Sequence, residues 1–568
     1  MGDFVFRIKR LHKKRSFVFV AFFIAAFLSF GQTLKIGFIW DDHQMIEKNP
    51  YIKNFSIENL KHNFSSNVFN QKGENYFRPF QTLTYMVDFA LFKLNPTGWH
   101  FVNFFLHVLN AFLLFLILDR LKFSARLAFL TGIFFSTNSI VVEQMIIVAG
   151  RAEIMTFTFT LASVLFYLKG GTKNLLFSFI FFILSMLSKE NGIITPLLII
   201  LALNFSGKRI SAGKILPFVL AIPIYLFYRQ CAVGKIVTGT TIMELARNAL
   251  VKFPLLLTNY LYKTIIPFNL HSHNMVKCSD SFWGIFFSFI MALFVIWIFS
   301  NNRRILKFSI LWYGICFLPK TLLLASQNLA LDHWAYPSNV GIFIIIAFYI
   351  RELGKKKIVF SQFLALLLTT NWIVFSNVNI SRRNTDLKIY ENAAKYETSN
   401  MVYYNLAREY YLRKDYAASA KLLEQVLQKE KNTMFLNSYA LVLLKIGERE
   451  KAKNILSEII KSGRQTPETY LNLASVYVHA GNYADAEKTL LAGSKAFPKN
   501  QDIMLRLARI YKINKKSEKS YRLLKEIINR NPYNQEALLN LGIMEYKKGN
   551  LPASKKCFLR LEKINKSR

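Results

Sequence analysis

Apolar runs alternate with short polar turns over the first two thirds of the chain. The first run covers about residues 16–38. A helix needs about 20 apolar residues to cross about 30 Å of hydrocarbon, so the pattern predicts about eleven membrane-spanning helices. The other runs lie near residues 99–118, 124–140, 152–168, 174–188, 191–206, 214–228, 282–299, 305–322, 338–351 and 357–377.

Basic residues gather in alternate turns between these runs. They lie at residues 119–122, 169–173, 207–209, 302–304 and 351–357, and a basic segment precedes the first run. Because basic turns stay on the cytoplasmic side, we expect a cytoplasmic N-terminus. The first run spans the hydrocarbon and has no clear small-residue cleavage site, so it is predicted to remain as a signal anchor. The acidic and mixed polar turns, and the C-terminal part, are then extracytoplasmic.

The C-terminal part repeats with a regular period. Ala407, Ala440, Ala474, Ala508 and Gly542 recur at intervals of 33, 34, 34 and 34 residues. Small residues are needed where two antiparallel helices approach closely, and this period is typical of the tetratricopeptide helix hairpin. Such repeats stack into an α-solenoid whose groove usually takes an extended peptide, although a spacer or an oligomerisation arm remains an alternative.

Together these patterns predict an all-α chain of two domains. Residues 1–380 form a polytopic membrane domain, and residues 385–568 form a domain of about five tetratricopeptide repeats. The composition supports this prediction, because 52% hydrophobic residues with 53 Phe exceed what a soluble core of this size needs.

The formal net charge of +39 raises the question of a nucleic-acid partner. The basic residues lie in membrane turns and on helical surfaces, without a glycine or aromatic nucleic-acid signature, so we predict no nucleic-acid binding. Cys231 and Cys278 fall in one predicted outer loop, where a disulfide bridge and two unpaired thiols both remain open.

Two adjacent carboxylates, Asp41 and Asp42, follow the first apolar run. Burial and mutual repulsion raise the cost of ionising such a pair beside a membrane. A carboxylate with a raised pKa can remove a proton from an acceptor hydroxyl. A helix cap explains the pair equally well on spacing alone. The two groups could also hold a hard divalent cation, although the chemistry requires no metal.

Candidate phosphate ligands occur in later outer turns. Arg151 could bind a phosphate bidentately or pair with Glu143 or Glu153. Lys189, beside Glu190, could neutralise a departing phosphate or lie at the membrane interface.

A third outer turn carries Asp332 and His333. A His beside an Asp could carry a proton or donate a hydrogen bond to a phosphate.

These segments together resemble tetratricopeptide-containing transmembrane O-mannosyltransferases and their bacterial relatives. The resemblance rests on Trp40-Asp41-Asp42, Phe77-Arg78-Pro79, Gly150-Arg151-Ala152-Glu153 and Ser188-Lys189-Glu190-Asn191-Gly192 in this order, followed by the repeats. It implies an inverting glycosyltransferase of the GT-C type that uses a polyprenyl-phosphate sugar. It also implies that Asp41 or Asp42 is the catalytic base, with Asp41 favoured, and that Arg78, Arg151 and Lys189 bind or shape the phosphate site.

The turn at Asp332-His333-Trp334 departs from the family pattern, which has Arg where this chain has His333. We expect the donor phosphate to lie near Arg151, Lys189 and His333, with Glu143, Glu153, Glu190 and Asp332 in supporting positions.

The expected function is transfer of a mannose-like sugar to a hydroxyl, with protein Ser or Thr favoured and delivered along the repeat groove. The expected location is a bacterial inner membrane. Two alternatives remain, a glycosyltransferase for glycolipid or surface polysaccharide and a non-enzymatic, membrane-anchored assembly factor.

Overall fold

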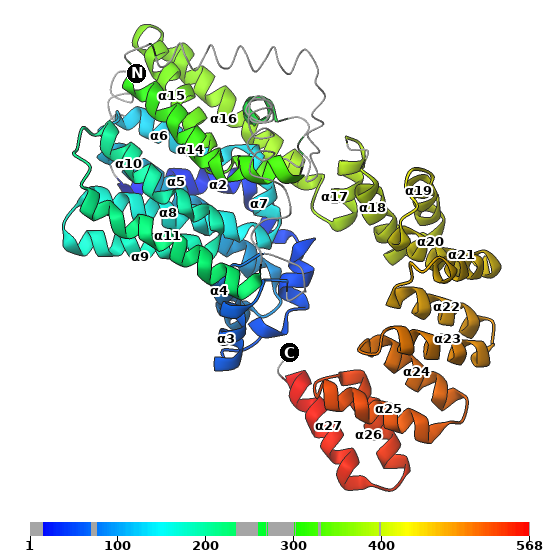
Figure 1. Ribbon diagram of the computed structural model, residues 1–568. Coiled ribbons are helices and arrows are strands. Elements are labelled where there is room, and N and C mark those ends of the chain that lie inside the picture. Colours follow the sequence, from blue (N-terminus) through cyan, green and yellow to red (C-terminus); the bar gives the residue numbers. More distant parts are fainter. Residues whose placement is uncertain are drawn as a thin grey trace. The chain divides into compact units, whose positions relative to one another are not determined.

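The computed structural model describes residues 15–69, 76–234, 260–267, 270, 300, 303–327, 331–396 and 399–566. The chain divides into two compact units, Met1–Glu397 and Thr398–Arg568. Every regular element in the described residues is a helix, so the all-α prediction is confirmed there (Figure 1).

The helices of the first unit coincide with the predicted apolar runs. The run near residues 282–299 lies outside the described residues. The helices that cover the other runs are α2 (Arg15–Phe30), α5 (Pro96–Arg120), α6 (Ala125–Thr137), α8 (Arg151–Lys169), α9 (Thr172–Ser188), α10 (Thr195–Phe205), α11 (Ala212–Val233), α14 (Arg304–Gln327), α15 (Asn339–Lys356) and α16 (Ile358–Ser381).

Fewer of these helices meet the length and hydropathy expected of a membrane span. Among the described residues five do so, and a bent pair, Ala125–Thr137 with Ser139–Ile146, makes up to six. The predicted number of about eleven is therefore not confirmed. One reason is length, because α10 has 11 residues and a rise of about 1.5 Å per residue leaves it short of the hydrocarbon thickness.

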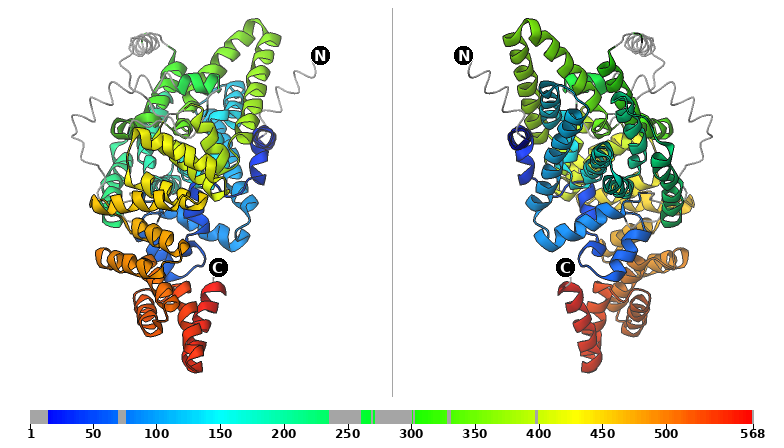
Figure 2. Two further views of the ribbon diagram at one scale, coloured as in Figure 1. Left: turned by 90° about the vertical axis from the view of Figure 1, so that its right-hand side faces the viewer. Right: turned by 90° about the vertical axis from the view of Figure 1, so that its left-hand side faces the viewer.

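Two features of the first unit agree with helices that pack together in lipid. Gly132 on α6 lies so close to α2 that an added Cβ would overlap the ring of Phe22. Helix α16, which forms a hairpin with α15 (yellow-green in Figure 2), exposes Val359, Phe363 and Leu366. Close small-residue contacts inside and large apolar side chains outside are typical of membrane helices.

Short elements between the long helices position the polar residues of interest. A π-helical turn covers His43–Glu47, and α3 (Ile57–Ser65) and α4 (Pro79–Phe92) follow before α5. Further along the chain, α7 (Val142–Ile146) and the 3-10 turn Val148–Gly150 lead into α8. The segment α17 (Asp386–Ala394) follows α16 and lies within the first unit.

Residues 399–566 of the second unit form helical hairpins in sequence order, coloured yellow to red in Figure 1. Each hairpin has a small residue in its first helix and another 12 positions later in its second. Ser419, Ser520 and Ser554 donate hydrogen bonds of 2.7, 2.8 and 2.9 Å to the carbonyl oxygens of Ala407, Ala508 and Gly542. The hairpins are α18 (Asn400–Leu412) with α19 (Tyr416–Lys429), α20 (Thr433–Ile446) with α21 (Arg449–Lys461), α22 (Pro467–His479) with α23 (Tyr483–Ala496), α24 (Gln501–Ile513) with α25 (Ser517–Arg530), and α26 (Gln535–Lys547) with α27 (Leu551–Lys566).

Candidate active site

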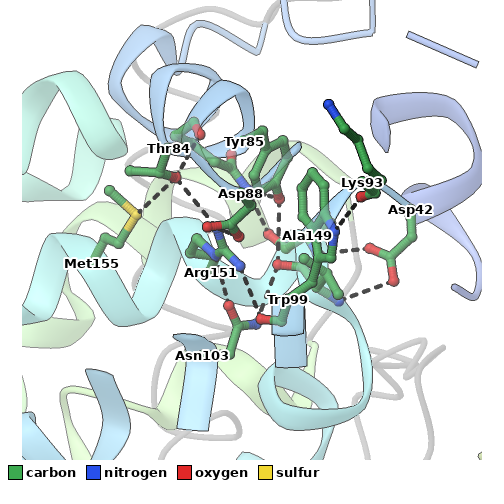
Figure 3. A network of polar contacts seen from close by, with 12 residues as sticks. Asp42, Thr84, Tyr85, Asp88, Lys93, Trp99, Asn103, Ala149, Arg151 and Met155 are labelled. Carbon is green, nitrogen blue, oxygen red and sulfur yellow. Dashed lines mark hydrogen bonds and ion pairs between the residues drawn. The ribbon is translucent and has the colours of Figure 1, made fainter. Parts of the chain in front are cut away.

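Asp42 is fully buried and binds the backbone that precedes α8. Its Oδ1 accepts a hydrogen bond of 2.7 Å from the N–H of Ala149, and its Oδ2 accepts from the N–H of Val148 at 3.0 Å and of Ile39 at 3.4 Å. Figure 3 shows the carboxylate directed at this backbone. Burial raises the pKa of Asp42 to about 7, against the opposing effect of the three N–H donors. Asp42 therefore caps the distant 3-10 turn Val148–Gly150 from a buried position, in addition to its local bond with Ile39.

Asp41 lies beside Asp42 and is half-buried. Its neighbour Trp40 has a positive φ of 55°, a conformation that a bulky residue rarely adopts. The N–H of Trp40 donates a 2.7 Å hydrogen bond to Oδ1 of Asp386 at the start of α17. The backbone that presents Asp41 is thus fixed on both sides, by the Asp386 bond before it and by the Asp42 bonds after it.

His43 completes the link to α17. Its Nε2 lies 3.0 Å from Oδ2 of Asp386, and its Nδ1 contacts Glu47. The hydrogen bond with Asp386 raises the pKa of His43 to about 9, so the imidazole is a cation at neutral pH. Burial raises the pKa of Asp386, but the hydrogen bonds from His43 and Trp40 outweigh it and hold that pKa below its ordinary value.

Arg151 begins α8 and is fully buried. Its guanidinium pairs with Asp88 on α4, donates from Nε to Oδ1 of Asn103 at 2.7 Å, and donates from Nη2 to the carbonyl oxygen of Trp99 at 2.9 Å (Figure 3). Its ion-pair partner is therefore Asp88, and neither Glu143 nor Glu153, the two partners that the sequence offered as one alternative, pairs with it.

Glu153, one helical turn or less from Arg151, binds two lysines. Its Oε2 lies 2.7 Å from Nζ of Lys189, and its Oε1 lies 2.6 Å from Nζ of Lys320 on α14. Asn191 donates to the same carboxylate at 3.3 Å. Among the described residues, two ammonium groups thus share one carboxylate in this buried cluster.

The turn at 332–335 carries two further pairs. Nδ1 of His333 lies 2.9 Å from Oε1 of Glu143, and Oδ1 of Asp332 lies 2.7 Å from Nζ of Lys263. Asp332 is 1% exposed, whereas the His333 side chain is 19% exposed. His333 and Asp332, although adjacent in the chain, therefore belong to two different ion pairs.

Arg78 is half-buried and forms the N-terminal boundary of α4. Its guanidinium lies over the ring of Tyr76 at 5.1 Å, and its Nε is a buried donor without a hydrogen-bond acceptor among the described residues. Glu190 also keeps a buried oxygen, Oε2, without a donor among them.

The hydroxyl of Tyr85 on α4 joins the diacidic loop to the start of α8. It donates a hydrogen bond to the carbonyl oxygen of Val148, whose N–H binds Asp42. Arg78 lies at the N-terminal boundary of the same helix, α4.

The donor set around the diacidic pair bears on a possible metal ion. Both oxygens of Asp42 already accept N–H hydrogen bonds. In the described part of the chain no group of three or more His, Cys, Asp or Glu residues could hold a metal. Cys231 is an exposed free thiol, and Cys278 lies outside the described residues.

Sequence reasoning missed four charged partners, namely Asp88, Lys263, Lys320 and Asp386. A signal existed for two of them, because Asp88 and Lys320 are isolated charges in apolar helices, and intramembrane or interfacial charges usually find partners. Lys263 and Asp386 lie in segments with several other polar residues, so neither stands out as an isolated charge in an apolar helix.

Comparison with known proteins gives matches in both parts of the chain. The family model described as Tetratricopeptide repeat matches residues 467–510. A protein O-mannosyl-transferase of Caenorhabditis elegans is 22% identical over 396 residues, which cover 65% of this chain and 56% of that protein. The protein O-mannosyl-transferase TMTC1 of Homo sapiens is 31% identical over 190 residues, which cover 30% of this chain and 21% of that protein.

The chain thus spans about half or less of the length of these curated relatives. A solved structure, MamA 41-end from Desulfovibrio magneticus RS-1, is 16% identical and covers 30% of this chain and 98% of its own, with a TM-score of 0.26. The resemblance inferred from the motifs is confirmed: this chain is similar to protein O-mannosyl-transferases and carries a tetratricopeptide repeat.

Proposed function

We propose that this protein is a membrane glycosyltransferase that transfers a mannose-like sugar from a polyprenyl-phosphate donor to a hydroxyl, with protein Ser or Thr as the favoured acceptor. The similarity to protein O-mannosyl-transferases supports the reaction class. The proposed site rests on one observation, namely that the two adjacent carboxylates have different surroundings. Asp42 fixes the backbone through three N–H bonds, and Asp41 next to it stays partly accessible.

In the proposed reaction Asp41 accepts the proton of the acceptor hydroxyl. The hydroxyl oxygen bonds to the anomeric carbon as the bond from that carbon to the phosphate oxygen breaks, and the prenyl phosphate leaves with the electron pair. One displacement inverts the anomeric centre, as expected of a GT-C enzyme. A carboxylate base of this kind contributes about 10²–10⁴-fold to rate.

The proposed donor-phosphate ligands remain Arg78, Arg151, Lys189 and His333. These four side chains differ in how available they are to a phosphate, because Arg151, Lys189 and His333 each already contact a carboxylate. Arg78 has a buried donor nitrogen that no described residue accepts from. Arg78 is therefore the favoured contact, and Glu143, Glu153 and Asp332 act by holding the cations and the turn in place.

The proposed topology has about eleven spans, with the N-terminus cytoplasmic and the diacidic loop and repeats on the extracytoplasmic side of the membrane. The repeats would deliver the acceptor peptide. No step requires a divalent metal.

The test is Asp41→Asn in cells, read by mass spectrometry of surface peptides and glycolipids. We expect hexose on Ser- or Thr-containing peptides to fall by at least about 100-fold, because the base is lost. Asp119→Asn is the matched control, since Asp119 is an exposed acid in a predicted inner turn. Loss from a lipid would instead identify a glycolipid enzyme. Unchanged hexose, with a phenotype abolished by deletion of residues 399–568, would identify an assembly factor.

A further inference from the structure

One carboxylate, that of Asp386, binds the chain on both sides of the diacidic pair. Its Oδ1 accepts the 2.7 Å hydrogen bond from the N–H of Trp40, and its Oδ2 lies 3.0 Å from Nε2 of His43. Trp40 directly precedes Asp41, and His43 directly follows Asp42. We call these two contacts the Asp386 clamp, because together they enclose the pair.

The helix that carries Asp386 is itself fixed within the first unit. Ile389 of α17 is 1% exposed and belongs to the main hydrophobic core of that unit. Asn392 donates a 3.1 Å hydrogen bond to the carbonyl oxygen of Leu270, and the side chain of Thr385 caps the N-terminus of the helix. A side chain on a packed helix holds its partners more precisely than one on a loop, so Asp386 is suited to fix a backbone conformation.

The conformation that the clamp holds is one that the chain does not prefer. The φ of Trp40 is 55°, in the left-handed region, which is sterically unfavourable for a bulky residue. The same turn contains hydrogen bonds from the N–H of Asp42 to the carbonyl oxygen of Ile39 at 3.1 Å and from the N–H of His43 to that of Trp40 at 3.3 Å. Strained positions of this kind cluster at functional sites, where the surrounding structure holds them. Without the clamp, the backbone at Trp40 would be able to return to a negative φ.

The two carboxylates of the pair would respond differently to that relaxation. The side chain of Asp42 is held by its own hydrogen bonds to the N–H groups of Val148 and Ala149. Asp41 directly follows Trp40, so a change in the backbone dihedrals of Trp40 redirects the Asp41 side chain. The clamp therefore acts on Asp41 more than on Asp42.

We propose that Asp386 is a positioning residue, which holds the diacidic loop and with it the Asp41 carboxylate in the geometry needed for sugar transfer. Asp386 acts through Trp40 and His43 and takes no part in the proton transfer. The inference rests on the proposed function, because it takes Asp41 as the base. A misplacement of about 1 Å can slow a reaction about 100-fold, so even a small relaxation of the loop is measurable.

The test combines sugar transfer with hydrogen–deuterium exchange of the full-length protein in detergent. We expect Asp386→Ala to lower the hexose on surface peptides by about ten- to a hundredfold at matched protein levels, because both contacts of the clamp are lost. Exchange of the backbone amides of residues 39–43 should rise by at least about tenfold, since the N–H of Trp40 loses its acceptor. The amides of Val148 and Ala149 should stay protected, because Asp42 still binds them.

Two further variants sharpen the test. In Asp386→Asn the amide oxygen can still accept from Trp40, but the amide no longer balances the charge of His43, so we expect transfer to fall by about three- to fivefold. Asparagine has the size of aspartate, so this variant remains informative if Asp386→Ala fails to fold. Thr385→Ala is the matched control, because it removes the cap of α17 and keeps Asp386, and it should leave transfer and local exchange within about twofold.

Three outcomes would overturn the positioning role. The first is unchanged transfer in both Asp386→Ala and Asp386→Asn. The second is an equal loss in Thr385→Ala and Asp386→Ala, because the stability of α17 would then explain both. The third is faster exchange throughout the first unit in place of a change at residues 39–43, because this would show general destabilisation.

Asp41→Asn separates this inference from the proposed function. It keeps the clamp, so we expect normal exchange at residues 39–43 and loss of transfer. Loss of transfer in Asp41→Asn, with normal transfer in both Asp386 variants, would refute the positioning role alone. Normal transfer in Asp41→Asn, with faster local exchange and lower transfer in Asp386→Ala, would refute Asp41 as the base and keep Asp386 as the residue that positions the loop.

Discussion

The two units differ in how deeply most of their described ion pairs are buried. In the first, Arg151 and Asp88 form an ion pair with side chains 0% and 5% exposed. In the second, Arg509 and Glu536 form an ion pair with side chains 55% and 45% exposed. Removal of charges from water costs several kcal/mol per ion unless partners compensate it, whereas exposed pairs contribute about 0–1 kcal/mol. The first unit therefore depends on several buried ion pairs, whereas most ion pairs of the second unit lie at its surface.

Removing Asp88 should have the largest effect on stability. Asp88→Asn leaves the Arg151 guanidinium buried without its counter-charge, and we expect a loss of about 3–5 kcal/mol. Glu536→Gln is the control from the second unit and should cost less than about 1 kcal/mol. Thermal unfolding in detergent measures both. Equal small losses would show that the two units do not differ in this respect.

The next largest effect is expected at Asp42. Asp42→Asn replaces one acceptor oxygen by an amide NH₂ that faces peptide N–H groups, so we expect a loss of about 2 kcal/mol. Asp41→Asn, at a half-buried position, should cost less than about 1 kcal/mol. The unfolding temperatures of the two variants measure these losses. A larger loss of stability in Asp41→Asn than in Asp42→Asn would show that Asp41, and not Asp42, is the structural member of the pair.

A smaller effect depends on pH and concerns His43. Its pKa is raised by Asp386 to about 9, so its contribution to stability is complete below the ordinary value of 6.5 and is lost as pH rises through 9. Because the side chain is 38% exposed, we expect at most about 1 kcal/mol. The wild type should therefore lose more stability between pH 7 and 10 than His43→Gln, as judged by unfolding temperature. Parallel pH curves would exclude this linkage.

The smallest effect is expected in the repeats. Ser520→Ala removes the 2.8 Å bond to the Ala508 carbonyl, but the equivalent positions of two other hairpins are Ala452 and Ala486. We expect a change of about 0.5 kcal/mol or less, because the hairpin tolerates alanine there. Ala486→Leu is the contrasting variant and should cost about 1–3 kcal/mol by overpacking a fully buried position.

The distance between partners along the chain explains what the sequence could predict. The repeat contacts join residues 12 positions apart, so a period in the sequence reveals them. The apolar runs likewise predicted the helices of the first unit. The partners of Asp42 lie 106 and 107 residues away, and Lys320 lies 167 residues from Glu153. No local pattern encodes such pairs, so the charged residues were found but several of their partners were not.

The hydrogen bond from Trp40 to Asp386 joins positions 346 residues apart and stabilises a left-handed backbone that costs a bulky side chain roughly 1–2 kcal/mol. A catalytic fragment trimmed at the end of α16 would lose this tether, and the peptide that presents Asp41 would be able to relax. The shortest fragment worth expressing for enzymology therefore extends past Asp386 and includes α17.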